Sequence, residues 1–244
     1  MVAVRSAFTV AHVLVSCEHA SNRIPARYAN LGLGRAALAS HIAWDCGAAI
    51  MARLAARRLG CPCHLGRWSR LVVDLNRRPG HPKLIAPRSF GVDVPGNRDL
   101  SRHEHERRSR LYHASFRERA LADIRRIIAA RGACMHLSVH SFTPVVAGEV
   151  RRADVGLLYD PSRAREKAFA QRLAPLLSGA GLHVRMNYPY RGTSDGFTTA
   201  CRSLFPAARY AALEIETNQK LLPDAAQAQR LGRLFADCLV RVLS

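Results

Sequence analysis

Short apolar runs alternate with longer amphipathic stretches along most of the chain. The apolar runs predict β-strands at residues 8–16, 61–66, 70–75, 134–140, 154–160, 182–187 and 208–216. Apolar residues at helical spacing predict α-helices at residues 44–60, 101–131 and 162–181, and from about residue 223 to the end of the chain. Strands that alternate with helices are typical of a mostly parallel sheet with helices on both faces. The pattern therefore predicts an α/β fold.

Local signals mark the helix ends and set two loops apart. Gly60 is a stop signal for the first long helix, and Asp45 lies in the cap region of the same helix. Ser101 is suited to cap the longest helix, because acidic residues follow it in the first turn. Residues 76–100 and 187–197 are rich in glycine, proline and polar side chains, which indicates irregular loops. Loops of this length in compact domains are usually functional or disordered.

Length and composition fit one globular domain. The chain has 244 residues, of which 48% are hydrophobic, so it can bury a large core, and we expect a single domain over residues 1–244. No stretch approaches the roughly 18 consecutive apolar residues that a membrane span needs. The N-terminal apolar run is interrupted by His12 and lacks the cleavage site of a signal peptide.

The cysteines indicate the compartment. Seven cysteines, an odd number with no CxxC pair, are not typical of a disulfide framework or a structural zinc knuckle. They fit a reducing environment. We therefore expect a cytoplasmic protein without membrane association.

The chain is strongly basic, with a formal net charge of +19 at pH 7. Such a charge raises the possibility of nucleic-acid binding, because Lys and Arg neutralise phosphates. However, only three of the 37 basic residues are lysines, and the basic residues are spread along the chain. We therefore consider nucleic acid an unlikely partner and expect the field to favour small anionic substrates.

Polar residues with metal-binding or acid–base chemistry stand at the ends of several predicted elements. His19 follows the first strand, Asp45 opens the first long helix, and His140 ends the strand at 134–140. Glu214 and Glu216 lie in the last strand. Two imidazoles and a carboxylate, with a fourth position for water, are the ligand set of a catalytic zinc, and a second carboxylate beside them suits a general base.

Each of these residues also has a structural interpretation. His140 can be satisfied by backbone groups, and Asp45 can serve as a helix cap. Glu214 and Glu216 are harder to explain, because side chains alternate along a strand and both carboxylates therefore share one face. Unpaired buried charges are costly, so this pair needs partners or a metal.

Six segments carry a resemblance to a known family. The segments SCEHASNRIP, HIAWDCGAA, SRLVVDLNRR, SVHSFTPV, NYPYRGTSDGFTT and LEIETNQKLL, in this order, resemble the motifs of the N-formylglutamate amidohydrolase family, from about Phe8 to Leu222. The resemblance implies a three-layer α/β/α sandwich of the phosphorylase/hydrolase type, related to zinc carboxypeptidases and zinc-dependent N-acetylmuramoyl amidases. It also implies a hydrolase that uses zinc or another divalent metal to cut a linear amide, typically N-formylglutamate to formate and glutamate.

The resemblance also implies roles for individual residues. His19 and His140 match the metal-binding histidines, and Asp45 stands where related amidases place a carboxylate ligand. We assign the catalytic carboxylate to Glu216 in preference to Glu214, because a polar or amide residue and then an aliphatic pair follow it in ETNQKLL. The choice between the two stays open.

One position departs from a related pattern. Asn22 stands three residues after His19, where a carboxypeptidase-like HxxE motif has its glutamate. This departure is the reason for choosing Asp45 as the third ligand. Cys17 and Glu18, which precede the first histidine, are expected to support the metal ligands without binding the metal themselves.

The segments without candidate metal ligands suit the binding of an anion. Arg70, Asn76, Arg77 and Arg191 are charged or amide donors beside loops, and such groups can grip substrate carboxylates in bidentate fashion. Each arginine could equally be a solvated surface residue or part of an ion pair. Asp74 is a candidate partner for one of them.

Other catalytic chemistries have weaker support. Ser69 and Ser141 lack the GxSxG context of a nucleophilic serine, and Cys17 beside His19 is a minor candidate for a thiolate nucleophile. Two functional alternatives stay open: a related zinc amidase acting on another N-acyl amino acid or a peptidoglycan-type amide, and a basic nucleic-acid-binding protein with a decayed site. The sequence does not predict the oligomeric state.

Overall fold

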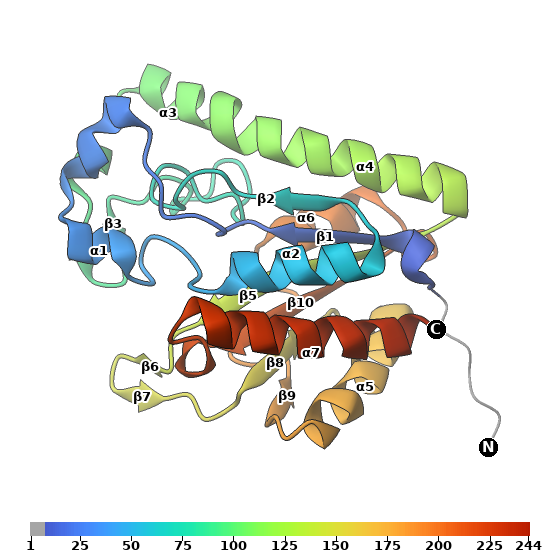
Figure 1. Cartoon of the computed structure of the whole chain (residues 1–244). Helices are drawn as coiled ribbons and strands as arrows, with labels where there is room; N and C mark the ends of the chain where they lie inside the picture. Colours follow the sequence, from blue (N-terminus) through green and yellow to red (C-terminus); the bar gives the residue numbers. More distant parts are fainter. Residues whose placement is uncertain (1–7) are drawn as a thin grey trace.

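A six-stranded sheet forms the centre of the protein. The computed structural model describes residues 8–244, and the strand order is β2-β1-β5-β10-β8-β9 (Figure 1). The strand bounds are β1 Val13–Cys17, β2 Cys63–Leu65, β5 Cys134–Phe142, β8 Val155–Leu158, β9 Val184–Met186 and β10 Tyr210–Asn218. β2, β1, β5 and β10 pair in parallel, whereas β8 runs antiparallel to β10 and parallel to β9.

Helices cover both faces of this sheet, which confirms the predicted three-layer α/β/α fold. The main helices are α2 Ala48–Leu59, α3 Arg102–Arg108, α4 Ser115–Arg131, α5 Ala164–Gly179, α6 Phe197–Leu204 and α7 Ala225–Leu243. Figure 1 shows α3 and α4 along one side of the sheet, and α2 and α7 along the other. Val15, Leu137 and Leu213 face the α2, α5 and α7 layer, and Leu14 and Ala212 face the α4 and α6 layer, as alternation along a strand requires.

Shorter elements lie mostly in the connections. They are α1 Arg35–Ala39, the hairpins β3 Arg88–Ser89 with β4 Val92–Asp93 and β6 Val145–Val146 with β7 Glu149–Val150, and the 3-10 helices Val10–His12, Ala26–Gly32, Pro95–Asn97 and Gln219–Leu221. A π-helical segment, Ser109–Ala114, joins α3 to α4. No helix within residues 8–244 is both long and apolar enough to span a membrane.

The helix ends follow the predicted chemistry in most places. The Ser101 side chain accepts a hydrogen bond from the Glu104 N–H at the start of α3, and Gly60 ends α2 with φ of 63°. Asp45 is not the cap of α2. The N-cap is Gly47, whose φ of 78° favours glycine and lets the chain turn from Asp45 into the helix.

The predicted strand at residues 70–75 is wrong. This run forms turns, and its backbone bonds to loops: the Arg70 N–H donates to the Ala43 carbonyl, and the Asp74 N–H donates to the Leu84 carbonyl. Leu71 is buried, but it packs in a cluster away from the sheet. An apolar run therefore indicated burial correctly without indicating a place in the sheet.

Two further differences concern single elements. The sequence pattern missed α6, which begins at Phe197 directly after an irregular loop and is only eight residues long. Cys17, two residues before His19, also differs from the expectation in its surroundings, because its side chain packs in the hydrophobic core on the α2 side.

Candidate active site

The polar face of the sheet gathers the candidate residues. Side chains alternate along β5 and β10, so Ser138, His140, Glu214 and Glu216 all point to the α4 and α6 side, opposite the apolar positions. The parallel register pairs Glu216 with His140 and Glu214 with Ser138. Because the carboxyl ends of parallel strands meet at one edge of a sheet, His19, two residues after the end of β1, lies at the same edge.

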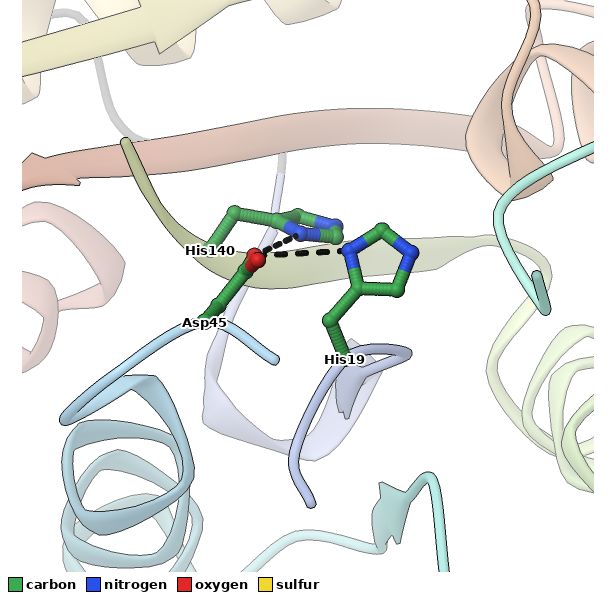
Figure 2. A group of neighbouring side chains, drawn as sticks. All are labelled: His19, Asp45 and His140. Atoms are coloured by element: carbon green, nitrogen blue, oxygen red, sulfur yellow. Dashed lines mark hydrogen bonds and ion pairs between the residues drawn. The ribbon is translucent and has the colours of Figure 1, made fainter. Parts of the chain in front are cut away.

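His19, Asp45 and His140 form one buried cluster. Figure 2 shows the Asp45 carboxylate in contact with both imidazoles: its Oδ2 lies 2.8 Å from Nδ1 of His140 and 3.4 Å from Nδ1 of His19. Two hydrogen bonds from backbone N–H groups hold this arrangement: the Asp45 N–H donates to the His19 carbonyl, and the Ser141 N–H donates to Asp45 Oδ2.

Two further carboxylates contact the Nε2 atoms of these imidazoles, the nitrogens that face away from Asp45. Nε2 of His19 lies 2.7 Å from Oδ1 of Asp74, and Nε2 of His140 lies 2.9 Å from Oε2 of Glu18. The Ser138 hydroxyl donates to the same Glu18 oxygen. A carboxylate at Nε2 favours a proton on that nitrogen, so Nδ1 of each imidazole is the nitrogen that faces Asp45 and can serve as a metal ligand once it has no proton of its own.

The pKa shifts of Asp45 and His140 show that the site favours positive charge. Burial acts to raise the pKa of Asp45, but the charge of His19 and the hydrogen bond from His140 outweigh it and keep this pKa well below its usual range. Burial acts to lower the pKa of His140, but its hydrogen bonds to Asp45 and Glu18 raise it well above the ordinary value. A cation between these groups is therefore stabilised by the surrounding carboxylates.

These residues fit a divalent metal. Their donor atoms lie within 4.8 Å of one another, and Nδ1 of His19 is buried without a hydrogen-bond partner among residues 8–244. Two imidazole nitrogens and one carboxylate oxygen suit zinc and leave one position open for water. The carboxylates behind the imidazoles match the supporting shell that metal-bound histidines usually have.

Glu216 and Glu214 differ in their surroundings. Oε2 of Glu216 is buried and has no hydrogen-bond partner within the described part of the chain. Burial raises the pKa of Glu216 to about 7, with the charge of His140 acting in the opposite direction. Glu214 instead accepts a hydrogen bond from the Thr198 hydroxyl. Of the two carboxylates, Glu216 is therefore the better candidate for acid–base chemistry.

A pocket of about 440 Å³ opens over these groups. His19, Asp45, His140 and both glutamates line it. It also contains a set of cationic side chains, namely Arg70, Arg77, Lys83, Arg151 and Arg191. A buried carboxyl group, a cluster that could hold a metal and a set of basic side chains are thus combined in one cavity, an arrangement that suits an anionic substrate.

Comparison with known proteins identifies the family. The sequence model of N-formylglutamate amidohydrolase matches residues 11–222. The chain belongs to the N-formylglutamate amidohydrolase family. This confirms the resemblance found in the sequence and supports a hydrolase of the amidohydrolase type.

Solved structures share the fold of this family member. A gene product of Agrobacterium tumefaciens matches with a TM-score of 0.82 and 32% identity, covering 95% of this chain and 90% of the other. An N-formylglutamate amidohydrolase from Ralstonia eutropha JMP134 matches with a TM-score of 0.75 and 19% identity, covering 98% of this chain and 95% of the other, which supports the fold. No curated protein matches the chain.

The candidate substrate-binding residues of this amidohydrolase differ in their contacts. Arg70 is held by Asp74, with Nη2 2.8 Å from Oδ2, and its Nη1 lies 3.7 Å from Asp45. Asn76 lines the pocket, and its Oδ1 accepts a hydrogen bond from the Phe197 N–H, which leaves the side-chain NH₂ group to donate elsewhere. Arg70 therefore lies close to the cluster, and Asn76 is oriented by the start of α6.

The other two arginines differ in depth. Nη1 of Arg77 donates to the Asp195 carbonyl at 3.3 Å, and the Nε of Arg77 is buried without a partner among residues 8–244. Arg191 lines the pocket but is exposed, so it lies at the entrance. A substrate carboxylate would meet Arg191 near the entrance and Arg77 further in.

Several pocket residues escaped the sequence analysis. His41, Lys83, Arg151, Tyr190 and Gln219 line the cavity. Tyr190 adjoins Arg191 in the NYPYRG segment, so that motif contained a signal for it. Arg151 donates to the Tyr190 hydroxyl at 3.2 Å. His41 and Gln219 likewise lie in the segments HIAWDCGAA and LEIETNQKLL. Lys83 and Arg151 lie outside the six segments, and only the folded chain brings them to the cavity.

Proposed function

We propose that this protein hydrolyses the linear amide of an N-formyl amino acid, with N-formyl-L-glutamate as the first candidate substrate and zinc as the metal. The observation that carries the proposal is the Glu216 carboxylate, whose Oε2 has no hydrogen-bond partner within residues 8–244, in the same pocket as the His–Asp–His cluster. Membership of the N-formylglutamate amidohydrolase family supports the choice of substrate.

The proposed metal ligands are Nδ1 of His19, Oδ2 of Asp45 and Nδ1 of His140. A divalent ion bound there would supply positive charge that acidifies water and polarises the amide carbonyl. Asp74 and Glu18 would keep the Nδ1 lone pairs directed inward, because each holds the opposite nitrogen of its imidazole.

Glu216 would move the proton in this reaction. In its ionised form it accepts a proton from the attacking water as the new C–O bond forms. It then gives this proton to the amide nitrogen as the C–N bond breaks, so that formate and the free amino acid leave and the carboxylate is restored. The pKa of about 7 suits both steps near neutral pH, because neither form of the carboxyl is strongly favoured.

The basic side chains would orient the amino-acid half of the substrate. Arg77, Arg191 and the Asn76 amide would bind its carboxylates, since guanidinium and amide donors match carboxylate geometry. Arg70 is already engaged with Asp74, so we assign it to holding Asp74 and to stabilising negative charge that develops on the carbonyl oxygen.

The test combines metal content with product formation. Purified protein is analysed for metal by elemental mass spectrometry, and formate release from N-formyl-L-glutamate is measured with and without a chelator. About one zinc per chain with chelator-sensitive formate release is the expected result. A cytoplasmic location stays a prediction, which cell fractionation can test.

Two outcomes would change the assignment. Metal without formate release would point to another N-acyl amino acid or a peptidoglycan-type amide, and a panel of N-formyl and N-acetyl compounds would separate these substrates. A protein that takes up no metal, hydrolyses no panel member and binds DNA with a steep salt dependence would instead be a basic nucleic-acid-binding protein.

A further inference from the structure

A second cavity lies on the other side of the segment that supports the active site. It has a volume of about 370 Å³, within the range of small-molecule sites. Val73 and Leu75 form one wall, whereas Asp74 and Asn76, which alternate with them, contact or line the active site. The opposite wall comes from the π-helical segment Ser109–Ala114 and the start of α4.

The lining of this cavity combines aromatic rings with aliphatic groups. Trp68, Tyr112 and Phe116 line it, and the Trp68 and Tyr112 rings meet edge to face with centroids 6.3 Å apart. Leu111 also lines the cavity and is 46% exposed, a large exposed fraction for leucine in a folded chain. Such walls favour a flat apolar body, because rings can stack or pack edge to face against it.

The charged groups of the cavity are all positive. Arg67 and Arg119 line it, and no acidic residue does. The Arg67 guanidinium lies over the Trp68 ring at 5.1 Å, and within residues 8–244 neither arginine has an ion-pair partner. Exposed arginines beside an apolar cavity favour an anionic group on the ligand, since guanidinium binds carboxylate in bidentate fashion.

From this combination we propose that the cavity is a second ligand site, for a small planar aromatic carboxylate. The ring system packs between Trp68 and the Val73–Leu75 wall, and the carboxylate binds Arg67 and Arg119. The site is separate from the proposed amide hydrolysis and does not depend on it.

The ligand contacts a segment that is anchored from the same side. The His113 imidazole Nε2 bonds the Arg77 carbonyl at 2.8 Å, and Arg117 donates to the carbonyls of Leu75 and Arg77. A ligand that binds between residues 67–75 and the helical segment 109–119 restrains both walls of the cavity together. Deuterium uptake of their backbone amides is therefore a local reporter of binding.

The test uses 2-naphthoate as the probe and equilibrium dialysis as the assay. We expect saturable binding that saturating L-glutamate does not displace. The double variant Arg67→Gln/Arg119→Gln should weaken binding at least about tenfold, the scale of one charge-assisted contact. The matched control is Arg125→Gln, which removes an exposed arginine of α4 that has no ion pair within residues 8–244 and does not line the cavity, and it should bind as the parent does.

A second variant tests whether the ligand occupies the cavity itself, without removing any charge from the protein. Ser115→Trp fills the cavity without changing the charge, and it should abolish binding while the thermal melting curve stays cooperative. Binding should also slow deuterium uptake in residues 67–77 and 109–119.

Three results would overturn the proposal. They are no saturable binding up to about 10 mM, competitive displacement by L-glutamate, and unchanged affinity in both the double variant and Ser115→Trp.

Discussion

Replacing Glu216 by glutamine separates proton transfer from every other role of this side chain. Glutamine has nearly the same size, and Oε2 of Glu216 has no hydrogen-bond partner among residues 8–244 that the change would break. Glu216 is also outside the His19, Asp45 and His140 cluster. The variant should therefore fold, with a change in unfolding free energy within about 0.5 kcal/mol, and keep its metal content.

The expected loss is in catalysis. A positioned general base contributes about 10²- to 10⁴-fold, so kcat for N-formyl-L-glutamate should fall by that factor, which corresponds to about 2.7–5.5 kcal/mol in the activation barrier. The assay is formate release at saturating substrate, with circular dichroism and metal analysis on the same sample. The matched control is Glu214→Gln, which keeps an oxygen acceptor for the Thr198 hydroxyl.

The pH profile gives an independent readout. Glu216 accepts a proton only when ionised, and with a pKa of about 7 roughly one tenth of it is ionised at pH 6 and about nine tenths at pH 8. Activity should therefore fall as the pH drops below 7, and a bound divalent cation would move this limb toward lower pH. Glu216→Gln should lose the limb, whereas Glu214→Gln should keep it.

Two results would refute this reasoning. A Glu216→Gln enzyme with more than about a tenth of the parent kcat would remove Glu216 as the base. If Glu214→Gln lost the acid limb and Glu216→Gln retained it, Glu214 would be the base.

Three further changes test the metal cluster and the core. His140→Ala should bind little metal and lose formate release, as elemental analysis and the activity assay will show; full metal content with full activity would contradict the ligand assignment. Asp74→Asn should weaken metal affinity by about 10- to 100-fold, measured by competition with a chelating dye, because His19 loses the carboxylate at its Nε2. Leu137→Ala, at a fully buried position of β5, should cost about 2–5 kcal/mol in urea unfolding, and a loss below 1 kcal/mol would mean a looser core.

The sequence by itself determined the α/β class and much of the element order. Hydrophobic periodicity and end signals such as Gly60 and Ser101 act over a few residues, so a linear pattern records them. Those signals predicted all six strands of the central sheet and most of the helices, and they wrongly added a strand at residues 70–75. The six motif segments also identified the family, because their order along the chain is itself a sequence property.

Only the tertiary structure decided which side chains contact one another in the site. The carboxylates behind His19 and His140 come from Asp74 and Glu18, and these contacts select which imidazole nitrogen faces Asp45. The two glutamates of β10 share one face in the sequence pattern, and the Thr198 hydroxyl of α6, a helix that the pattern missed, is what distinguishes them.

Long-range packing likewise decided the surroundings of the site. The apolar run at 70–75 resembled a strand, yet its hydrogen bonds go to Ala43 and Leu84 in distant loops, and no local pattern records those partners. Lys83 and Arg151 reach the pocket from different parts of the chain, outside the six motif segments, for the same reason. Periodicity and caps are local properties of a sequence, whereas the convergence of titratable groups depends on which distant segments pack together.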